Sequence, residues 1–228
     1  MKQKNKPSLN LYIALSSLFV AALIVCNLIA NKFISIDLGF KTFIISAGVL
    51  PYPLTFLITD ILSETFGKKL TTKVVITGFI SSIVVLIILW LGNQFNAIEN
   101  SPVSDQSYEM IFQNSYRVIF ASMAAYLSAQ MIDVKIFHYW KRKTNGKHLW
   151  LRNNLSTVFS QLVDTTLVVV VLFAGVLETS IMIEYIIDGW LFKVLCALVD
   201  TPIFYFAVAT IRKHFGLAIN EEIGITAD

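Results

Sequence analysis

The chain alternates long apolar segments with short polar ones. A transmembrane helix needs about 20 mostly apolar residues, and six segments approach or reach that length. The fourth is the shortest, and the last contains a lysine, an aspartate and a proline. The pattern predicts an all-α integral membrane protein: a single bundle of six transmembrane helices over residues 11–212, between tails at 1–10 and 213–228. The predicted helices are Leu11–Ala30, Phe43–Phe66, Val74–Leu91, Tyr116–Ile132, Leu155–Leu177 and Ile186–Ile211.

Basic residues fall in alternate connections between these segments. The first tail, the second and fourth connections and the last tail hold three, three, six and two Lys or Arg residues. The connections between them are mostly acidic. Because positive charge stays on the cytoplasmic side, we expect both tails in the cytoplasm and an even number of crossings.

Composition supports a membrane protein and excludes several other classes. The residues are 56% hydrophobic and 14% charged, whereas soluble domains are about 25% charged. A net charge of +3 is too small to indicate a nucleic-acid partner. Cys26 and Cys196 lie in apolar segments without metal-ligand spacing, so we expect no metal and no cofactor. No nucleophile–base pair occurs within the apolar segments, and we expect no enzyme.

Two carboxylates interrupt the second apolar segment. A charge at the bilayer centre costs at least about 2.5–3.5 kcal/mol, so such residues generally serve a function. Asp60 and Glu64 are four residues apart and share one helix face. Asp60 is the deeper and is a candidate binding residue. Glu64 is either a site residue or an interfacial acid paired with Lys68.

A Gln-x-x-Asp pattern occurs twice, near the cytoplasmic half of two adjacent predicted helices. Gln130 and Asp133 end the fourth segment, and Gln161 and Asp164 lie in the fifth. Three-residue spacing places each amide and carboxylate on one helix face. Asp133 has an alternative interpretation as an interfacial acid paired with Lys135. Asp164 has no basic neighbour in the sequence, which favours a functional role.

Two further polar residues lie within predicted helices. Lys193 is expected to pair with an intramembrane acid, to contact substrate, or to extend to the membrane surface. Asn27 either bonds to another helix or faces a ligand. Together with the acids and amides, they predict a polar cavity among the helices.

Four segments strongly resemble the vitamin uptake transporter family, whose members are also called queuosine precursor transporters. They occur in the family's order and read PLTFLITDILSETFGKK, FASMAAYLSAQMIDVKIF, STVFSQLVDT and LFKVLCALVDTPIFY. The resemblance implies a multi-pass protein of the bacterial inner membrane that imports a 7-deazapurine. The family's motif positions fall on Asn27, Asp60, Gln130, Asp133, Gln161, Asp164 and Lys193, and Glu64 fits the common form of the motif.

The substrate implied by this resemblance is 7-cyano-7-deazaguanine, 7-aminomethyl-7-deazaguanine or queuine. A carboxylate can accept the paired N–H donors of a guanine-like edge, and an amide can serve its carbonyl. Phe56, Phe159 and Trp190 are candidates to stack on the ring. If protons drive import, a buried carboxylate carries them, and Asp164 is the first choice. A homo-oligomer is compatible with the sequence.

Two rival functions are considered. The chain could be the substrate-binding subunit of an energy-coupling-factor transporter, in which separate ATPase and coupling subunits drive release. It could also be an intramembrane aspartyl protease, but the Gly-x-Gly-Asp signature of that group is absent. An importer of queuosine precursors is therefore the expected function.

Overall fold

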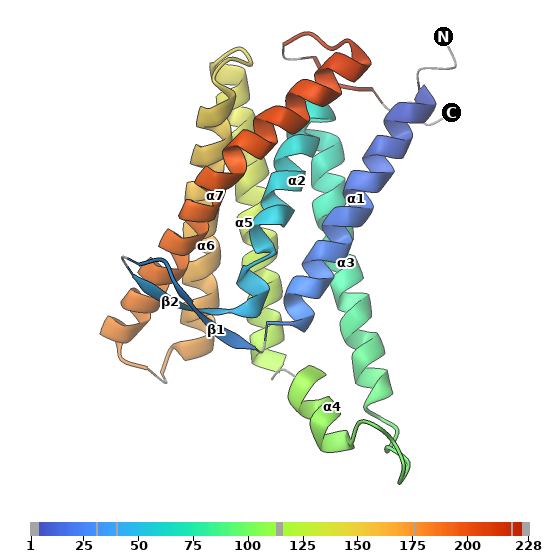
Figure 1. Ribbon diagram of the computed structural model, residues 1–228, viewed down its shortest axis with the longest axis vertical. Coiled ribbons are helices and arrows are strands. Elements are labelled where there is room, and N and C mark those ends of the chain that lie inside the picture. Colours follow the sequence, from blue (N-terminus) through green and yellow to red (C-terminus); the bar gives the residue numbers. More distant parts are fainter. Residues whose placement is uncertain are drawn as a thin grey trace.

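The computed structural model describes residues 5–30, 32–39, 41–112, 116–175, 177–219 and 221–224. The fold is mostly helical, with one short β-hairpin between the first two helices (Figure 1). The elements are α1 (Asn5–Leu28), β1 (Phe33–Asp37), β2 (Thr42–Ser46), the 3₁₀ turn η1 (Ala47–Val49), α2 (Tyr52–Thr65), α3 (Gly67–Gly92), α4 (Asp105–Phe112), α5 (Tyr116–Lys143), α6 (Leu149–Phe173) and α7 (Thr179–Phe215).

The long helices run alternately up and down the molecule. The start of α1 and the end of α7 lie at the same end, which we call the N/C end (Figure 1). The hairpin and α4 lie toward the other end, which we call the hairpin end. The turns from α2 to α3 and from α5 to α6 are at the N/C end, so the strongly basic stretches of the sequence gather there.

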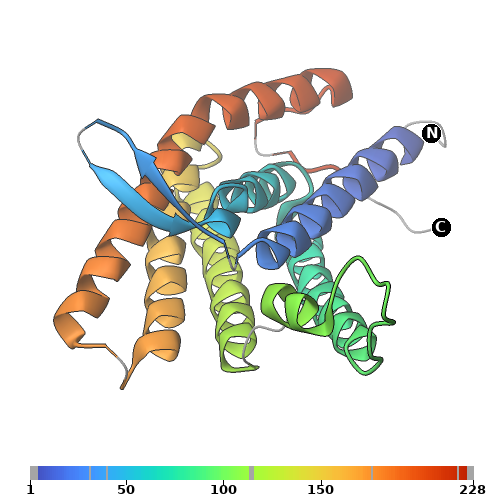
Figure 2. The same cartoon turned by 60° about the horizontal axis from the view of Figure 1, so that its bottom comes forward.

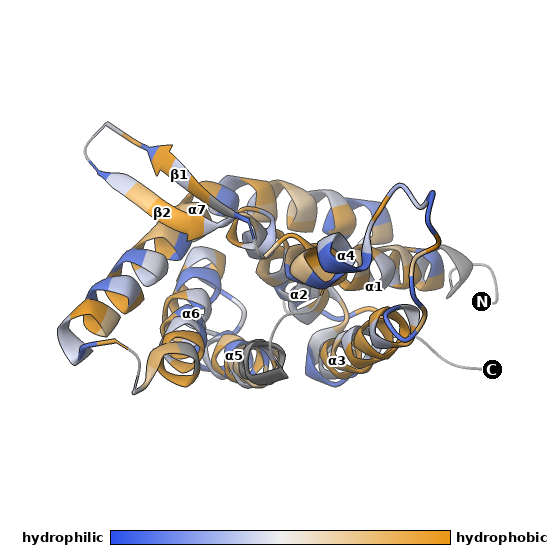
Figure 3. Cartoon of the chain, turned by 90° about the horizontal axis from the view of Figure 1, so that it is seen from below, coloured by the Kyte–Doolittle hydropathy of each residue, from blue (hydrophilic) through white to orange (hydrophobic). Residues whose placement is uncertain are grey.

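Within the described part of the chain, four helices are long and apolar enough to cross a membrane: α1, α3, α6 and α7. Their outward faces carry apolar side chains, among them Ile80, Val199 and Phe206, and apolar residues are prominent on these helices in Figure 3. Such faces are suited to contact with lipid chains. α5 has 28 residues, but its last turn carries Lys141, Arg142 and Lys143.

The prediction of one spanning helix over Phe43–Phe66 is wrong, because the segment includes a strand, whereas the expectation of a mostly helical chain is confirmed. Thr42–Ser46 is a strand whose side chains alternate between exposed and buried, with Phe43 and Ile45 inward. That period of two suits a strand rather than a helix. The helix α2 begins at Tyr52, directly after Pro51, and its 14 residues span only about 21 Å.

The hairpin is attached to α7. The rings of Phe43 and Phe192 lie 5.6 Å apart between centroids, and Phe43 is fully buried. Lys41 forms an ion pair with Asp188 at the start of the same helix. Figure 2 shows the two strands lying beside α7. These contacts hold the hairpin beside the start of α2, at the hairpin end of the bundle.

The short helix α2 lies at the centre of the molecule. It contacts α1, α3, α5 and α7, and residues 58–67 are all buried. Polar side chains on α2 are therefore enclosed by protein on every side. The turn into α3 depends on Gly67, whose φ of +77° is a conformation that other residues rarely adopt.

Candidate functional site

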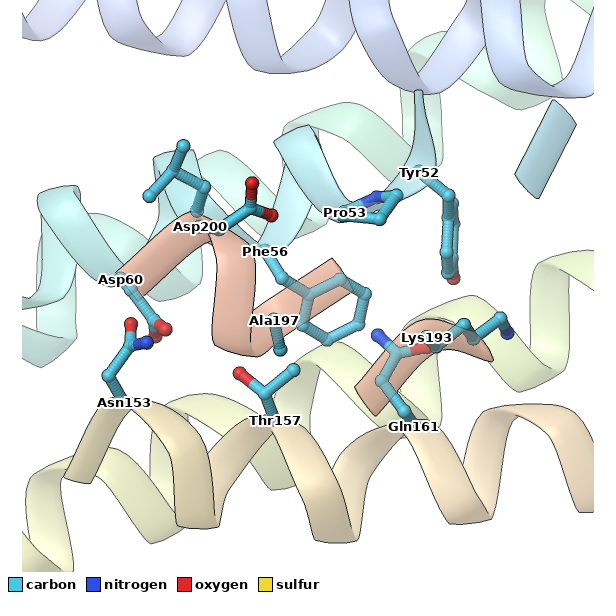
Figure 4. Close-up of a pocket in the computed structure, with 11 residues that line it drawn as sticks. Tyr52, Pro53, Phe56, Asp60, Asn153, Thr157, Gln161, Lys193, Ala197 and Asp200 are labelled. Carbon is cyan, nitrogen blue, oxygen red and sulfur yellow. The ribbon is translucent and has the colours of Figure 1, made fainter. Parts of the chain in front are cut away.

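A small cavity of about 20 Å³ lies between α2, α6 and α7. This volume holds about one water molecule, so a purine-sized ligand would need the three helices to move apart. Phe56 forms part of its apolar wall, and Figure 4 shows polar side chains converging on it from all three helices. The polar lining consists of Tyr52, Asp60, Asn153, Thr157, Gln161, Lys193 and Asp200.

One end of this cavity is formed by a buried ion pair between α6 and α7. Lys193 Nζ lies 2.6 Å from Asp164 Oδ2 and 3.2 Å from the hydroxyl of Thr165. The hydroxyl of Tyr52 donates to Asp164 Oδ1 at 3.1 Å, and Lys193 Nζ lies 5.0 Å from the centre of the Tyr52 ring. The expected pairing of Lys193 with an intramembrane acid is thus observed, and Asp164 has both a cation and a neutral donor.

A second polar group joins α2 to α5 and α6. The carboxyl groups of Asp60 and Asp133 lie close to each other. Ser160 donates to Asp133 Oδ1 at 3.1 Å, and Thr59 donates to Gln130 Oε1 at 3.2 Å. Among the described residues, neither acid has an ion-pair partner. Asp60 reaches the cavity, whereas Asp133 and Gln130 lie behind it.

Glu64 belongs to a different cluster, made of charges at the N/C end. Arg152 approaches Glu64 Oε2 with Nη2 at 2.7 Å and Nε at 3.1 Å. Arg212 pairs with the other carboxylate oxygen, and Lys141 Nζ lies 3.9 Å from Oε2. Lys68, the sequence neighbour expected as an alternative partner, is exposed. Glu64 is therefore bound by cations of three other helices and does not line the cavity.

Asn27 is also separate from the central cavity. It lines a second cavity of about 70 Å³, with mostly apolar lining residues, bounded by α1, α3, α4 and α5. There the hydroxyl of Ser122 donates to Asn27 Oδ1 at 3.5 Å. This contact agrees with the alternative expectation that Asn27 bonds to another helix.

The residues predicted from the sequence therefore do not form one site in the structure. Asp60, Gln161 and Lys193 line one cavity, Asp164 contacts it through Lys193, and Gln130 and Asp133 support it from α5. Of the aromatic candidates, Phe56 lines the cavity. Phe159 is 52% exposed, and the Trp190 indole N–H donates to the backbone carbonyl of Val158.

Sequence reasoning missed several residues of the site. Tyr52, Asn153 and Thr157 line the cavity, and Arg152 is fully buried beside Glu64. Tyr52, Asn153 and Thr157 are uncharged and do not stand out in the sequence. Arg152 precedes the predicted helix start at Leu155, but α6 begins at Leu149 and places Arg152 in the interior.

The outward apolar faces and the polar groups buried between the helices are those of a multi-pass membrane protein. Comparison with known families agrees with this class. The model of the family described as "Putative vitamin uptake transporter" matches residues 46–207. The chain belongs to this vitamin uptake transporter family.

Two curated relatives carry more specific names. A "Probable queuosine precursor transporter" of Bacillus subtilis (strain 168) is 31% identical over 161 residues, covering 70% of each chain. A protein of the same description from Haemophilus influenzae is 27% identical over 121 residues, covering 52% of this chain and 47% of the relative. No solved structure matches the chain significantly. The protein is therefore a membrane transporter rather than an enzyme.

Proposed function

We propose that the protein imports a queuosine precursor, a 7-deazapurine, into the cytoplasm. The observation that carries this proposal is the cavity between α2, α6 and α7, enclosed by a carboxylate, amides and an ion pair. Both matched relatives are described as queuosine precursor transporters. A guanine-like edge, which has two donors beside an acceptor, needs the kinds of groups that this cavity offers.

The chemistry of the cavity supports a specific arrangement of the substrate. The amide oxygens of Gln161 and Asn153 are buried and meet no donor among the described groups, so they can accept N–H groups of the substrate. Phe56 offers an apolar ring face in the same cavity, and Lys193 can donate to the substrate carbonyl. An analogue that lacked the matching N–H groups would leave these oxygens unsatisfied, which penalises its binding.

The proposed orientation is six crossings, with the N/C end in the cytoplasm of a bacterium and the hairpin end outside the inner membrane. Lys68, Lys69 and Lys73 lie in the first turns of α3, and the last turns of α5 and α7 are also basic. All of these lie at the N/C end, as the positive-inside rule requires of a cytoplasmic face. In this arrangement α2 crosses as a short helix, extended by η1 and the hairpin.

Proton-driven import is part of the proposal, with the Asp60–Asp133 pair as the proton carrier in place of Asp164. Two neighbouring carboxylates repel each other in a low-dielectric interior, so the binding of a proton by one of them is favoured. Asp164 needs none, because Lys193 neutralises it. An inward pH gradient should therefore increase uptake, and Asp133→Asn should remove that increase.

The experiment that tests the function is uptake of a labelled 7-deazaguanine precursor into liposomes that contain the purified protein. Asp164→Asn should abolish uptake, because the change unbalances Lys193 at the edge of the cavity. Glu184→Gln is the matched control, since Glu184 is an exposed acid on α7 and its loss should leave uptake unchanged. Normal uptake by Asp164→Asn would remove Asp164 from the site, and no uptake by the unaltered protein would contradict the proposed substrate.

The alternative of a binding subunit that needs ATPase partners is not favoured. The matching family and both relatives are described as transporters. The same liposomes separate the two functions, because they contain no other subunit and uptake by the chain alone rejects the alternative.

A further inference from the structure

The Glu64 cluster lies between the central cavity and the N/C end. Glu64 is four residues beyond Asp60 on α2, one helical turn closer to that end, and Arg152 directly precedes Asn153 on α6. Asp60 and Asn153 both line the cavity, and Figure 4 shows them close together at one end of it. A molecule that leaves the cavity toward the N/C end must therefore pass the Glu64 cluster.

The cluster closes this route with charged side chains from four helices, of which three side chains are buried and one, Arg212, is partly exposed. Glu64 comes from α2, Lys141 from α5, Arg152 from α6 and Arg212 from α7. The side chains of Glu64 and Arg152 are fully buried. Arg152 also donates to the carbonyls of Gly146 and Lys147, at 3.0 Å each. The ion pairs thus tie α2 to the connection between α5 and α6, and to α7.

The segment 221–224 covers the cluster from outside. Glu222 accepts a hydrogen bond from Lys141 Nζ at 2.9 Å, and the same ammonium donates to the backbone carbonyl of Glu64 at 3.2 Å. The backbone N–H of Ile223 donates to the carbonyl of Thr65 at 2.7 Å. The Ile223 side chain is buried in the apolar cluster that includes Phe66. The segment is therefore fastened to the end of α2 by an ion pair, a backbone hydrogen bond and apolar contact.

Gly67 permits this close approach. A Cβ atom at Gly67 would collide with the carboxylate of Glu222. The glycine at the turn between α2 and α3 thus serves both the left-handed backbone and the fit of the covering segment.

We propose that the Glu64 cluster, with the segment 221–224 fastened over it, is the closed inner gate of the transport route. Buried ion pairs gain much from their mutual attraction only while water is excluded. When water enters, hydration replaces that attraction. The cluster can therefore alternate between a dry, paired state and a wet, separated state, whereas opening an apolar seal would expose apolar surface without any such compensation.

The gate is tested by the access of a reagent to the cavity, which needs no knowledge of the substrate. Cys26 and Cys196 are replaced by alanine, and Thr157→Cys places one thiol in the cavity. A membrane-impermeant, anionic thiosulfonate is applied from the N/C side of membrane vesicles. Labelling should be slow with the gate intact and at least about tenfold faster with Glu64→Gln, because a buried charge cluster that loses its acid no longer stays closed.

Two changes confined to the covering segment keep the test independent of folding of the bundle. Glu222→Gln should speed labelling by about two- to fivefold, the range expected for a partly exposed ion pair. Ile223→Ser should speed labelling by at least as much, because it removes a buried apolar side chain. Glu221→Gln is the matched control, because Glu221 bonds to the backbone N–H of Ala218 and should leave labelling unchanged. Equal labelling rates in the unaltered protein and in both segment variants would overturn the gate.

The description of this gate as the inner one rests on the proposed direction of import. The labelling test and the uptake test can nevertheless give independent results. Labelling from the N/C side reports whether the route is closed even if the substrate assignment is wrong. Conversely, uptake of a 7-deazapurine with no change in labelling would keep the function and reject the gate.

Discussion

At the scale of single residues, the pairing of buried charges affects both the stability of the protein and its proposed site. Lys193 Nζ lies 2.6 Å from Asp164 Oδ2, and both side chains are almost fully buried. Each is acceptable in a low-dielectric interior because the other is present. The pair therefore contributes to stability as well as to the proposed site, and the two contributions can be separated.

Lys193→Met should lower the free energy of unfolding by about 3–5 kcal/mol, because it leaves the Asp164 carboxylate buried without its cation. The double variant Lys193→Met/Asp164→Asn should regain most of that loss, since no buried charge remains, yet it should stay inactive in uptake. Thermal unfolding in detergent measures the first effect and liposome uptake the second. A double variant as unstable as the single one would contradict the assignment of the cost to an unpaired charge.

The sequence identified the important acids better than it identified their partners. Asp60, Asp133 and Asp164 were recognisable because a carboxylate in an apolar segment is costly and rarely accidental. Their partners lie far away in the chain, and Arg152 is 88 positions from Glu64. Four-residue spacing pointed to Lys68, but α2 ends at Thr65 and Lys68 lies on α3. Spacing also says nothing about cations that another helix brings to the same place.

At the scale of elements, the second apolar segment is a hairpin strand, a turn and a short helix. Thr42–Ser46 is a five-residue apolar run, and runs of that length are compatible with either a strand or a buried helix. Pro51 and Pro53 lie at the start of α2, and the strand before them depends on pairing with Phe33–Asp37. Such pairing is decided by the partner strand and by packing on α7.

Phe43→Ala should test whether the hairpin is held by α7. Removing a fully buried aromatic ring from its contact with Phe192 should cost about 3–5 kcal/mol of stability. Ile44→Ala is the matched control, because the adjacent side chain is 76% exposed and its loss should have little effect. Thermal unfolding of the two variants gives the comparison, and equal effects would contradict the packing of the hairpin on α7.

At the scale of the whole molecule, basic residues are grouped at the N/C end and the apolar faces of the long helices point outward. Charge alternation predicted that both tails share one side of the membrane, and in Figure 1 the start of α1 and the end of α7 lie at the same end of the bundle. The number of crossings depends on α2 and α5, which length and hydropathy alone do not identify as spanning helices.

Reporter fusions should resolve these crossings. A reporter that is active only in the cytoplasm should be active when fused after Lys213 or within residues 144–148, and inactive within the hairpin turn or the connection before α4. An enzyme that is active only outside the inner membrane should give the reverse pattern. Activity of the cytoplasmic reporter at the hairpin turn would contradict the crossing by α2.

The central claim is that this chain carries a queuosine precursor across the membrane, and the most direct measurement is the queuosine content of tRNA. The host should lack both synthesis of the precursor and its own importer, and each precursor should be supplied in turn. We predict that expression of the unaltered chain restores queuosine with at least one of 7-cyano-7-deazaguanine, 7-aminomethyl-7-deazaguanine or queuine, and that Asp164→Asn does not. Tests of the two guanine derivatives should use a host that can convert them, and the test of queuine should use one that can insert it. Absence of queuosine with all three precursors, while the protein is present in the membrane, would contradict the claim.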